Sequence, residues 1–317
     1  ATVDIAKSDT TANYQTLVDN LAYKNISDDP SATSRVVTLT SVQDSGGTAN
    51  SGADTGTLSI ASTVSITGVN DAPTLTATGS SPTYTENNAA ASLYTGTAIS
   101  TVESGQTVDK VTLSVTNVTD GTSEIMVIDG EDVTLTNGNT GTTASNSFVY
   151  TISLTGSTAT VDIAKSDTVT NYQTLVDNLA YKNSSEAPST ANNRVVTLTS
   201  VQDSGGTANG GADTGSLSIA STVTVAAVND APTLTGLGPT ATFAENTVNA
   251  TAQQLDNAVV FGDVDGLDFN TGLLTVTGVD ASETISVISQ AVGTAGNIQR
   301  TGNAIQVSDG AAWTDIG

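Results

Sequence analysis

Two acidic cassettes contain the residues with the clearest capacity for chemistry. "GVNDAPTLT" covers residues 68–76 and "AVNDAPTLT" covers residues 227–235, each directly after a β-like run. Asn and Asp supply amide and carboxylate oxygens, which are ligands for metal cations. The same residue types are common in tight turns. The cassette is therefore compatible with a plain turn, a hinge between domains or a metal-binding joint.

Composition excludes several kinds of site. The chain has 32 acidic and 8 basic residues, a net charge of -24, and neither Cys nor His. This charge repels nucleic acid and anionic membranes, which are bound through Lys and Arg, so it favours cations or serves as solubilising surface charge. Without Cys and His there is no disulfide, thiolate zinc site, Cys nucleophile or Ser-His-Asp triad. No phosphate loop or nucleophile elbow is present, so we expect no enzyme.

A long internal repeat organises the chain. Residues 1–25 return almost unchanged as 159–183, and residues 35–64 return as 194–223 after the insertion of one residue. The period is therefore about 159 residues, as in arrays of repeated structural units.

The repeat divides the chain into three parts. We expect residues 1–71 to be the C-terminal part of a β-sandwich unit, 72–230 to be a complete unit and 231–317 to be the N-terminal part of the next. The chain is then either a segment of a longer polypeptide, which we favour, or a subunit whose two incomplete repeats are completed by neighbouring copies. An isolated half would expose a hydrophobic face and open strand edges.

Within a unit the pattern is mostly that of β-strands. Apolar residues alternate with Thr or Ser over 109–118, 194–201 and 215–228, as in half-buried strands. One helical pattern interrupts them in "NYQTLVDNLAY", with Asn171 as the expected N-cap. Its apolar face comprises Tyr172, Leu175, Val176 and Leu179, repeated as Tyr14, Leu17, Val18 and Leu21. Many short strands separated by turn residues predict an all-β fold of antiparallel sandwiches.

Four stretches together resemble a known family. They are "TLTSVQDSGGTANGGADTGSLSIASTVTVAAVNDAP" (197–232), "YTENN" (84–88), "FAENT" (243–247) and "GDVDGLD" (262–268). They resemble tandem cadherin-like, Ig-like calcium-binding repeats of giant bacterial surface proteins, the type I-secreted, RTX-adhesin-like class. The resemblance covers essentially the whole chain. We therefore expect tandem antiparallel Ig-like/cadherin-like β-sandwiches, each with one short inserted helix, arranged linearly.

The resemblance implies Ca2+ at the joints between units. We use "first joint" for the surroundings of Asn70 and Asp71, and "second joint" for those of Asn229 and Asp230. The implied ligands of the second joint are Glu86, Asn229, Asp230, Asp263 and Asp265. Those of the first joint are Asn70, Asp71, Glu103 and Asp203, and Asp44, the repeat of Asp203, is also expected to face a joint.

Departures from the family pattern modify this expectation. Gly68 and Ala227 stand where the family has an Asp, and Thr101 replaces the first Asp of the Asp-x-Asp motif. We expect fewer ions per joint than in animal cadherins, and weaker binding at the first joint than at the second. In the repeated loop "DSGGTANGGADT" (203–214) we expect Asn209 and Asp213 to form turns.

Repetition favours a structural role, because arrays gain reach by adding units. The predicted function is a calcium-rigidified strut in an extracellular adhesin or fibre of the bacterial cell surface, able to form filaments. Its expected partners are calcium ions and neighbouring repeats or other copies, without nucleic acid or membrane insertion of this segment. The alternative is a ligand- or carbohydrate-binding adhesive module, although Trp313 is the sole Trp. Two lysine pairs recur in the repeat, Lys7/Lys165 and Lys24/Lys182. They are either ordinary surface lysines, which we favour, or members of an isopeptide crosslink.

Overall fold

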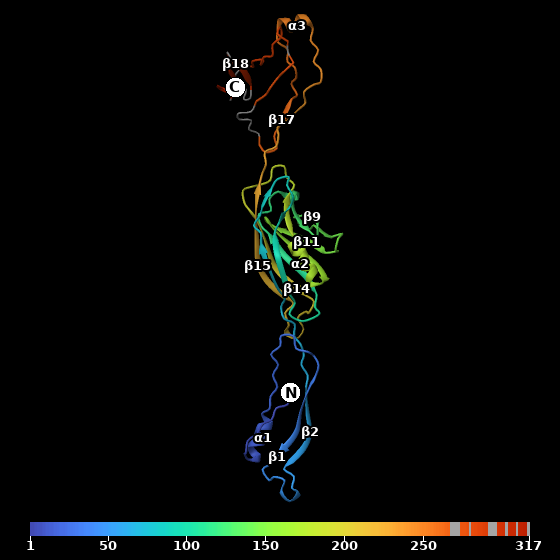
Figure 1. Ribbon diagram of the computed structural model, residues 1–317. Helices are drawn as coiled ribbons and strands as arrows, with labels where there is room; N and C mark the ends of the chain where they lie inside the picture. Colours follow the sequence, from blue (N-terminus) through green and yellow to red (C-terminus); the bar gives the residue numbers. More distant parts are fainter. Residues whose placement is uncertain (267–272, 279, 291–296, 302–303, 309, 316–317) are drawn as a thin grey trace. The chain divides into compact units, whose positions relative to one another are not determined.

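The computed structural model describes residues 1–317 except 267–272, 279, 291–296, 302–303, 309 and 316–317. It is mostly β and contains several sheets, which confirms the all-β prediction (Figure 1). The chain divides into two compact units, residues 1–227 and 228–317. No helix in the described part of the chain has the length and apolar character needed to cross a membrane.

The first unit begins with a partial repeat, residues 1–67. It contains helix α1 (Thr11–Asp19), strands β1 (Arg35–Gln43) and β2 (Thr55–Val64), and the short 3-10 helix η1 (Ala49–Ser51). β1 and β2 form an antiparallel hairpin with a register shift between Leu39 and Ser41. Residues 1–10 form no strand.

The remainder of the first unit, residues 72–227, is called the complete repeat below. Its early elements are β3 (Thr74–Gly79), β4 (Thr83–Thr85), β5 (Ala91–Ser92), β6 (Tyr94–Ser100), β7 (Val108–Val115), η2 (Gly121–Ser123), β8 (Glu124–Ile128) and β9 (Glu131–Thr134). They are followed by β10 (Thr140–Thr142), β11 (Val149–Thr155), β12 (Thr158–Asp167), α2 (Val169–Asp177), β13 (Ala180–Asn183), β14 (Arg194–Asp203), η3 (Ala208–Gly210) and β15 (Thr214–Ala226). The strands predicted over 109–118, 194–201 and 215–228 are thus present as β7, β14 and β15.

The strands of the complete repeat form three sheets. A seven-stranded sheet has the order β10-β11-β12-β7-β14-β15-β4, a four-stranded sheet has the order β5-β13-β8-β9, and β3 pairs with β6. All neighbouring strands are antiparallel except β4, which runs parallel to β15. Figure 1 shows β14 and β15 side by side.

One hydrophobic core connects the two larger sheets. Val111, Leu113 and Val115 of β7 are fully buried, because every second residue of a strand points to the same face. The four-stranded sheet contributes Met126 and Tyr181 to the same core. The ring of Tyr181 contacts that of Tyr84 edge-to-face, with centroids 5.9 Å apart.

Helix α2 places the predicted apolar face against this core. Tyr172, Leu175 and Val176 are buried, so the predicted stripe is confirmed. The predicted N-cap is wrong. Thr168 caps the helix, since its side chain accepts a hydrogen bond from the amide of Asn171. Asn171 lies inside the first turn, where its Nδ2 donates to Asp167 Oδ1 at 2.7 Å.

The second unit has few regular elements among its described residues. They are β16 (Thr233–Thr235), α3 (Glu245–Ala250), β17 (Val260–Gly262), β18 (Ile298–Thr301), β19 (Ala304–Ser308) and β20 (Trp313–Asp315). β16 pairs with β17, and β18, β19 and β20 form a three-stranded antiparallel sheet. Trp313 therefore begins the second strand of a hairpin, next to β19.

Candidate metal centre

The first joint lies within the first unit, and Asn70 is held there by a loop of the complete repeat. Asn70 Nδ2 donates to Asp203 Oδ1 at 3.0 Å and to the Ala212 carbonyl at 2.6 Å. The Ala212 amide donates back to the Asn70 carbonyl at 2.9 Å. Asp203 ends β14 and Ala212 precedes β15, so the β14–β15 hairpin fixes the linker.

The loop between β6 and β7 holds the linker as well. Gln106 Nε2 donates to Asn70 Oδ1 at 2.6 Å, and the Asp71 amide donates to Glu103 Oε1 at 2.9 Å. Two loops of the complete repeat thus converge on the Asn-Asp dipeptide. They bring together Asn70, Glu103 and Asp203, three of the predicted ligands, whereas the Asp71 side chain is exposed and contributes its backbone amide.

The glycines of the "DSGGTANGGADT" loop make room for this arrangement. A Cβ on Gly205 would lie 1.9 Å from Asn70 Oδ1, and one on Gly211 would lie 3.1 Å from the Asn70 backbone. Asn209 has a φ of 56°, in the left-handed region that Asn tolerates in turns. Asp213 accepts hydrogen bonds from Gln202 and Thr214. Both residues fit the predicted turn-forming role.

Three side-chain oxygens around this linker carry the case for a cation. Glu103 Oε2, Gln106 Oε1 and Asp203 Oδ2 are buried and have no hydrogen-bond partner among the described residues. Leaving a buried acceptor unsatisfied costs about 1–3 kcal/mol, and more for a charged group. Two carboxylates and one amide carbonyl are the donor types that Ca2+ prefers. These residues therefore fit a calcium ion at the first joint.

The surroundings of the Asp203 carboxyl disfavour its ionised form. Its side chain is only 2% exposed. Burial raises the pKa of the Asp203 carboxyl, and the charge of Glu103 raises it further, against hydrogen bonds from Gly205 and Asn70. A bound cation would reverse this, because a nearby positive charge favours the ionised carboxylate.

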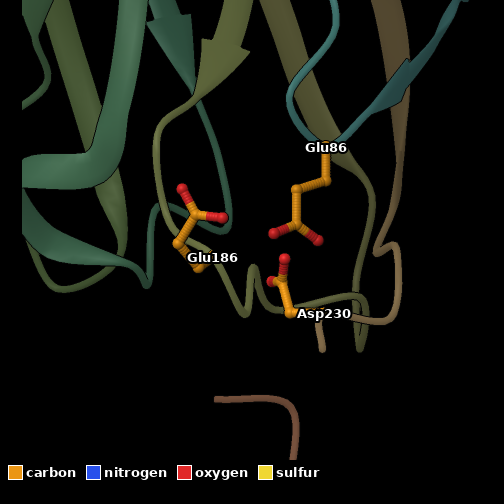
Figure 2. Close-up of side chains that lie close together, drawn as sticks. All are labelled: Glu86, Glu186 and Asp230. Carbon is orange, nitrogen blue, oxygen red and sulfur yellow. The ribbon is translucent and has the colours of Figure 1, made fainter. Parts of the chain in front are cut away.

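A second pair of carboxylates lies elsewhere in the first unit. Glu86 and Glu186 have carboxylate oxygens within 4.8 Å of one another (Figure 2). Glu86 is 2% exposed, and its amide donates to the Ala226 carbonyl at 2.9 Å. Glu186 is exposed and accepts a hydrogen bond from Asn87 Nδ2 at 3.1 Å. Figure 2 also draws Asp230, the first carboxylate of the second unit.

The remaining predicted ligands of the second joint belong to the second unit. The Asp230 amide donates to Asp265 Oδ2 at 2.5 Å, and the Asp265 amide donates to Asp263 Oδ1 at 3.1 Å. Asn229 is exposed, and its Nδ2 donates to the Asp230 carbonyl at 2.9 Å. Within this unit the Asn-Asp dipeptide is thus linked to the Asp-x-Asp motif.

Asp44 lies in the exposed hairpin loop of the partial repeat. Its Oδ1 accepts a hydrogen bond from the Gly46 amide at 2.8 Å. The equivalent Asp203 Oδ1 likewise binds Gly205, at 3.0 Å, but Asp203 also contacts Asn70. The two loops therefore share a local conformation, and the linker asparagine distinguishes them.

Sequence reasoning missed three acidic or amide side chains near these sites. They are Gln106, Glu186 and Asp29, whose Oδ2 accepts a hydrogen bond from the Ser104 amide at 3.1 Å. "DDP" (28–30) and "EAP" (186–188) are equivalent in the repeat. Asp28 and Glu186 recur two positions before a proline, with Asp29 next to Asp28, and this pattern was the signal that could have found Glu186 and Asp29.

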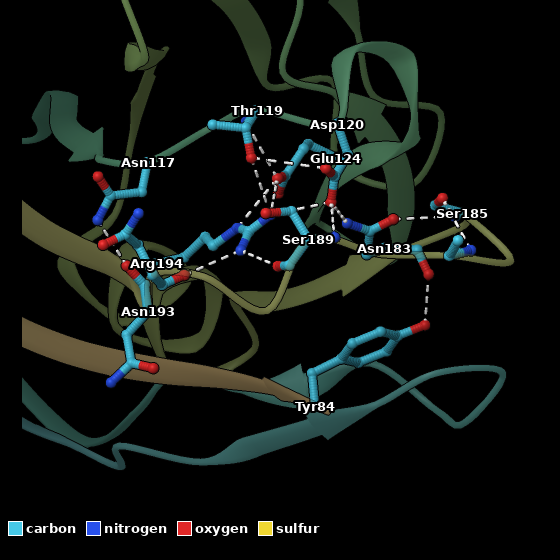
Figure 3. A network of polar contacts seen from close by, with 12 residues as sticks. Tyr84, Asn117, Thr119, Asp120, Glu124, Asn183, Ser185, Ser189, Asn193 and Arg194 are labelled. Carbon is cyan, nitrogen blue, oxygen red and sulfur yellow. Dashed lines mark hydrogen bonds and ion pairs between the residues drawn. The ribbon is translucent and has the colours of Figure 1, made fainter. Parts of the chain in front are cut away.

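A buried ion-pair network lies apart from the joints (Figure 3). Arg194 is fully buried, and its Nη2 lies 2.5 Å from Glu124 Oε1 and 2.9 Å from Asp120 Oδ2. Burial alone would lower the pKa of the Arg194 guanidinium, but the hydrogen bond and charge of Glu124 raise it. Tyr181 donates to Glu124 Oε2, and Asn183 Nδ2 donates to Asp120 at 2.6 Å. The network joins β8 to β13 and β14.

Lys165 and Lys182, the recurring lysines of the complete repeat, form ordinary ion pairs. Lys165 Nζ lies 2.7 Å from Asp167 Oδ2 and donates to the Asn146 carbonyl at 2.7 Å. Lys182 Nζ lies 2.5 Å from Asp132 Oδ2. About a third of each lysine side chain is exposed to solvent. These partly exposed pairs favour the surface-lysine alternative over a crosslink.

Comparisons with known proteins add no further constraint. The chain matches no protein-family model, no curated protein and no solved structure.

Proposed function

We propose that this chain is a segment of an extracellular strut in an adhesin or fibre of the bacterial cell surface. Its units are tandem Ig-like, cadherin-like β-sandwiches arranged in a line, stiffened by Ca2+ at their joints and able to form filaments. The observation that carries the proposal is the set of three buried oxygens around the first linker that have no hydrogen-bond partner in the described part of the chain.

At the first joint, Asp203, Glu103 and Gln106 would supply oxygens to the ion. Asn70 holds two of these side chains in place through hydrogen bonds to Asp203 and Gln106. When bound, the ion would neutralise the buried carboxylates and fix the linker to two loops at once. Pro73 adds stiffness, because proline restricts φ and lacks an N–H group. Ligation at the second joint by Glu86, Asn229, Asp230, Asp263 and Asp265 remains a prediction.

Repetition supports a strut better than an adhesive tip. A broad hollow in the complete repeat is lined by Asp129, Asn146, Asn171 and Asn178 together with Phe148. Phe148 is 1% exposed, so it offers no open aromatic face on which a sugar could stack. Within the described residues, this hollow gives no specific support to a carbohydrate-binding module.

The test is the response of the protein to calcium. We expect Ca2+ to raise the melting temperature and narrow the distribution of molecular lengths measured by X-ray scattering, relative to a chelator. A ligand at 100 times its Kd stabilises the folded state by about 2.7 kcal/mol. Identical melting curves and scattering profiles under both conditions would contradict the proposal.

A matched pair of variants locates the effect. Asp203→Asn should weaken calcium binding at the first joint, measured by calorimetry, by at least about tenfold because a buried carboxylate ligand is lost. Asp213→Asn removes a carboxylate that is hydrogen-bonded to Gln202 and Thr214 in the same loop, and should leave binding unchanged. Equal effects of the two substitutions would indicate nonspecific binding by surface charge.

A further inference from the structure

A hollow of about 530 Å³ lies beside helix α2 in the complete repeat, and we call it the α2 hollow. Three elements line it: α2 itself, the turn between β8 and β9 at Asp129 and Gly130, and the loop between β10 and β11 at Ser145 and Asn146. All three belong to the first unit. The volume is within the range of about 300–1,000 Å³ that is usual for sites of small ligands.

Helix α2 presents a polar face to this hollow. Asn171, Thr174 and the C-cap Asn178 follow the spacing i, i+3 and i+7, which places them on one side of a helix. All three are exposed, whereas Leu175 and Phe148, which complete the lining, are buried. The groups that a ligand can reach in the α2 hollow are therefore mainly amides and hydroxyls.

Two of these groups have no hydrogen bond within the described part of the chain. They are the side chains of Ser145 and Asn178, and both are exposed. In the partial repeat the equivalent Asn20 donates from Nδ2 to the Thr16 carbonyl at 2.6 Å. The same asparagine, in the identical sequence NYQTLVDN, thus binds its own helix in one repeat and is available to a ligand in the other.

Asp129 supplies a firmly held carboxylate to the α2 hollow. Its Oδ2 accepts hydrogen bonds from Thr143 Oγ1 at 2.6 Å and from the Asn146 amide at 2.8 Å, and its Oδ1 accepts one from Asn146 Nδ2 at 2.5 Å. Burial would raise the pKa of the Asp129 carboxyl, but these hydrogen bonds and the charge of Lys165 lower it below its usual value. A carboxylate has about four acceptor positions, so this ionised group can accept a further donor.

Negative charge predominates around the α2 hollow. Glu131 accepts a hydrogen bond from the Ala144 amide in the lining loop, and Asp167 directly precedes the N-cap of α2. Together with Asp129 they supply three carboxylates, against the ammonium of Lys165, which lies 2.7 Å from Asp167 Oδ2. No Lys or Arg of the described residues lines the hollow. This local field, in a chain with a net charge of -24, attracts cations.

We propose that the α2 hollow binds a primary alkylammonium group, carried by a lysine side chain or by a free polyamine. An ammonium has three donors and no acceptor, which matches a lining with a carboxylate, amide oxygens and no cation. It would donate to Asp129 and to the amide oxygen of Asn178, with the alkyl chain against Leu175. Asn171 uses its Nδ2 for Asp167, so its Oδ1 remains as an acceptor. This site goes beyond the proposed strut and does not depend on it.

Three probes test the chemistry of the ligand. Diaminopentane carries the group as a free amine, and Nα-acetyl-lysine methylamide carries it as a lysine side chain. Pentanediol is the uncharged analogue of the diamine. In saturating calcium we expect the amide NMR signals of Gly130 and Asn146 to shift saturably with an ammonium probe and not with the diol. Saturation by one ammonium probe alone would identify the source of the group. Equal shifts with the diol, or no saturable shift with either ammonium probe, would overturn the proposal.

Substitutions locate the binding of diaminopentane. Asp129→Asn should weaken it by about tenfold, because a charged acceptor is lost while the shape of the side chain is kept. Asn178→Ala should weaken it by about threefold and leave the melting temperature unchanged, because this side chain has no hydrogen bond within the described residues. Asp162→Asn is the control. It removes the same charge from the face of β12 that points away from the core, where Asp162 accepts a hydrogen bond from Thr112, and should not change the affinity.

Equal weakening by Asp129→Asn and Asp162→Asn would indicate general attraction to an acidic protein and overturn the site. The Asp203→Asn variant separates this proposal from that of calcium at the first joint, because it should keep ammonium binding. Loss of binding in Asp203→Asn but not in Asp129→Asn would place the ammonium at the first joint and overturn the α2 hollow. A protein that binds the ammonium in the α2 hollow but does not respond to calcium would contradict the strut and leave this inference intact.

Discussion

Replacing Glu124 with glutamine should lower the free energy of unfolding of the complete repeat by about 3–5 kcal/mol. Arg194 and Glu124 are both fully buried and lie 2.5 Å apart. The substitution keeps the shape of the side chain but removes the charge that balances the guanidinium, and among the described residues Asp120 is then the acidic partner that remains. Chemical denaturation followed by circular dichroism measures the change.

An exposed ion pair in the same repeat is the control. Asp132→Asn breaks the pair with Lys182, and the Asp132 side chain is 54% exposed. We expect a loss of less than about 1 kcal/mol. A double variant, Glu124→Leu with Arg194→Met, should lose much less than Glu124→Gln, because neither charge remains buried. If Glu124→Gln and Asp132→Asn had equal effects, the network would not be a major source of stability.

Gly215→Ala should separate the linker from β15 and destabilise the complete repeat by about 3 kcal/mol. A Cβ at this position would lie 1.9 Å from the carbonyl oxygen of Pro73. The Pro73 oxygen belongs to the backbone and the position of a Cβ is fixed by the backbone, so no side-chain rotation can relieve the clash. Thermal unfolding measures the loss, and hydrogen exchange of the β3 amides should increase with it.

The partial repeat provides the matched substitution. Gly56 is equivalent to Gly215, but a Cβ there would lie 3.5 Å from Val42 Cγ1, an ordinary van der Waals contact. Gly56→Ala should therefore be nearly neutral. A large effect at Gly56, or none at Gly215, would show that contact with the Pro73 backbone is not the reason for glycine at this position.

The sequence predicted the strands of the complete repeat and the buried face of α2, because both follow from the periodicity of apolar residues. It also singled out Asn70 and Asp203 from repeated acidic motifs, and the structure places these two side chains in contact. Periodicity alone does not decide the structure of a segment. Residues 1–10 and β12 have nearly the same sequence, yet only β12 is a strand, because β11 and β7 pair with it.

Long-range contacts were the part that the sequence could not predict. Arg194 and Glu124 are 70 residues apart, and no local spacing connects them. Gln106 is a single amide in a loop, and its role depends on how that loop reaches Asn70. Thr168 was overlooked as the N-cap because Asn171 is also a preferred capping residue, and three positions separate the two.

The parallel pairing of β4 with β15 determines how the complete repeat bears mechanical load. Residues 73–79, which precede β4, also run parallel to β15, since Pro73 lies against Gly215 and Gly79 lies against Ala220. Tension on the two ends of the repeat would draw these neighbouring parallel segments past each other along their length. The β4–β15 hydrogen bonds would then be strained together in shear, instead of being peeled apart one by one. Resistance to pulling is governed by the rate of unfolding, so this geometry would give the repeat a high rupture force under rapid loading.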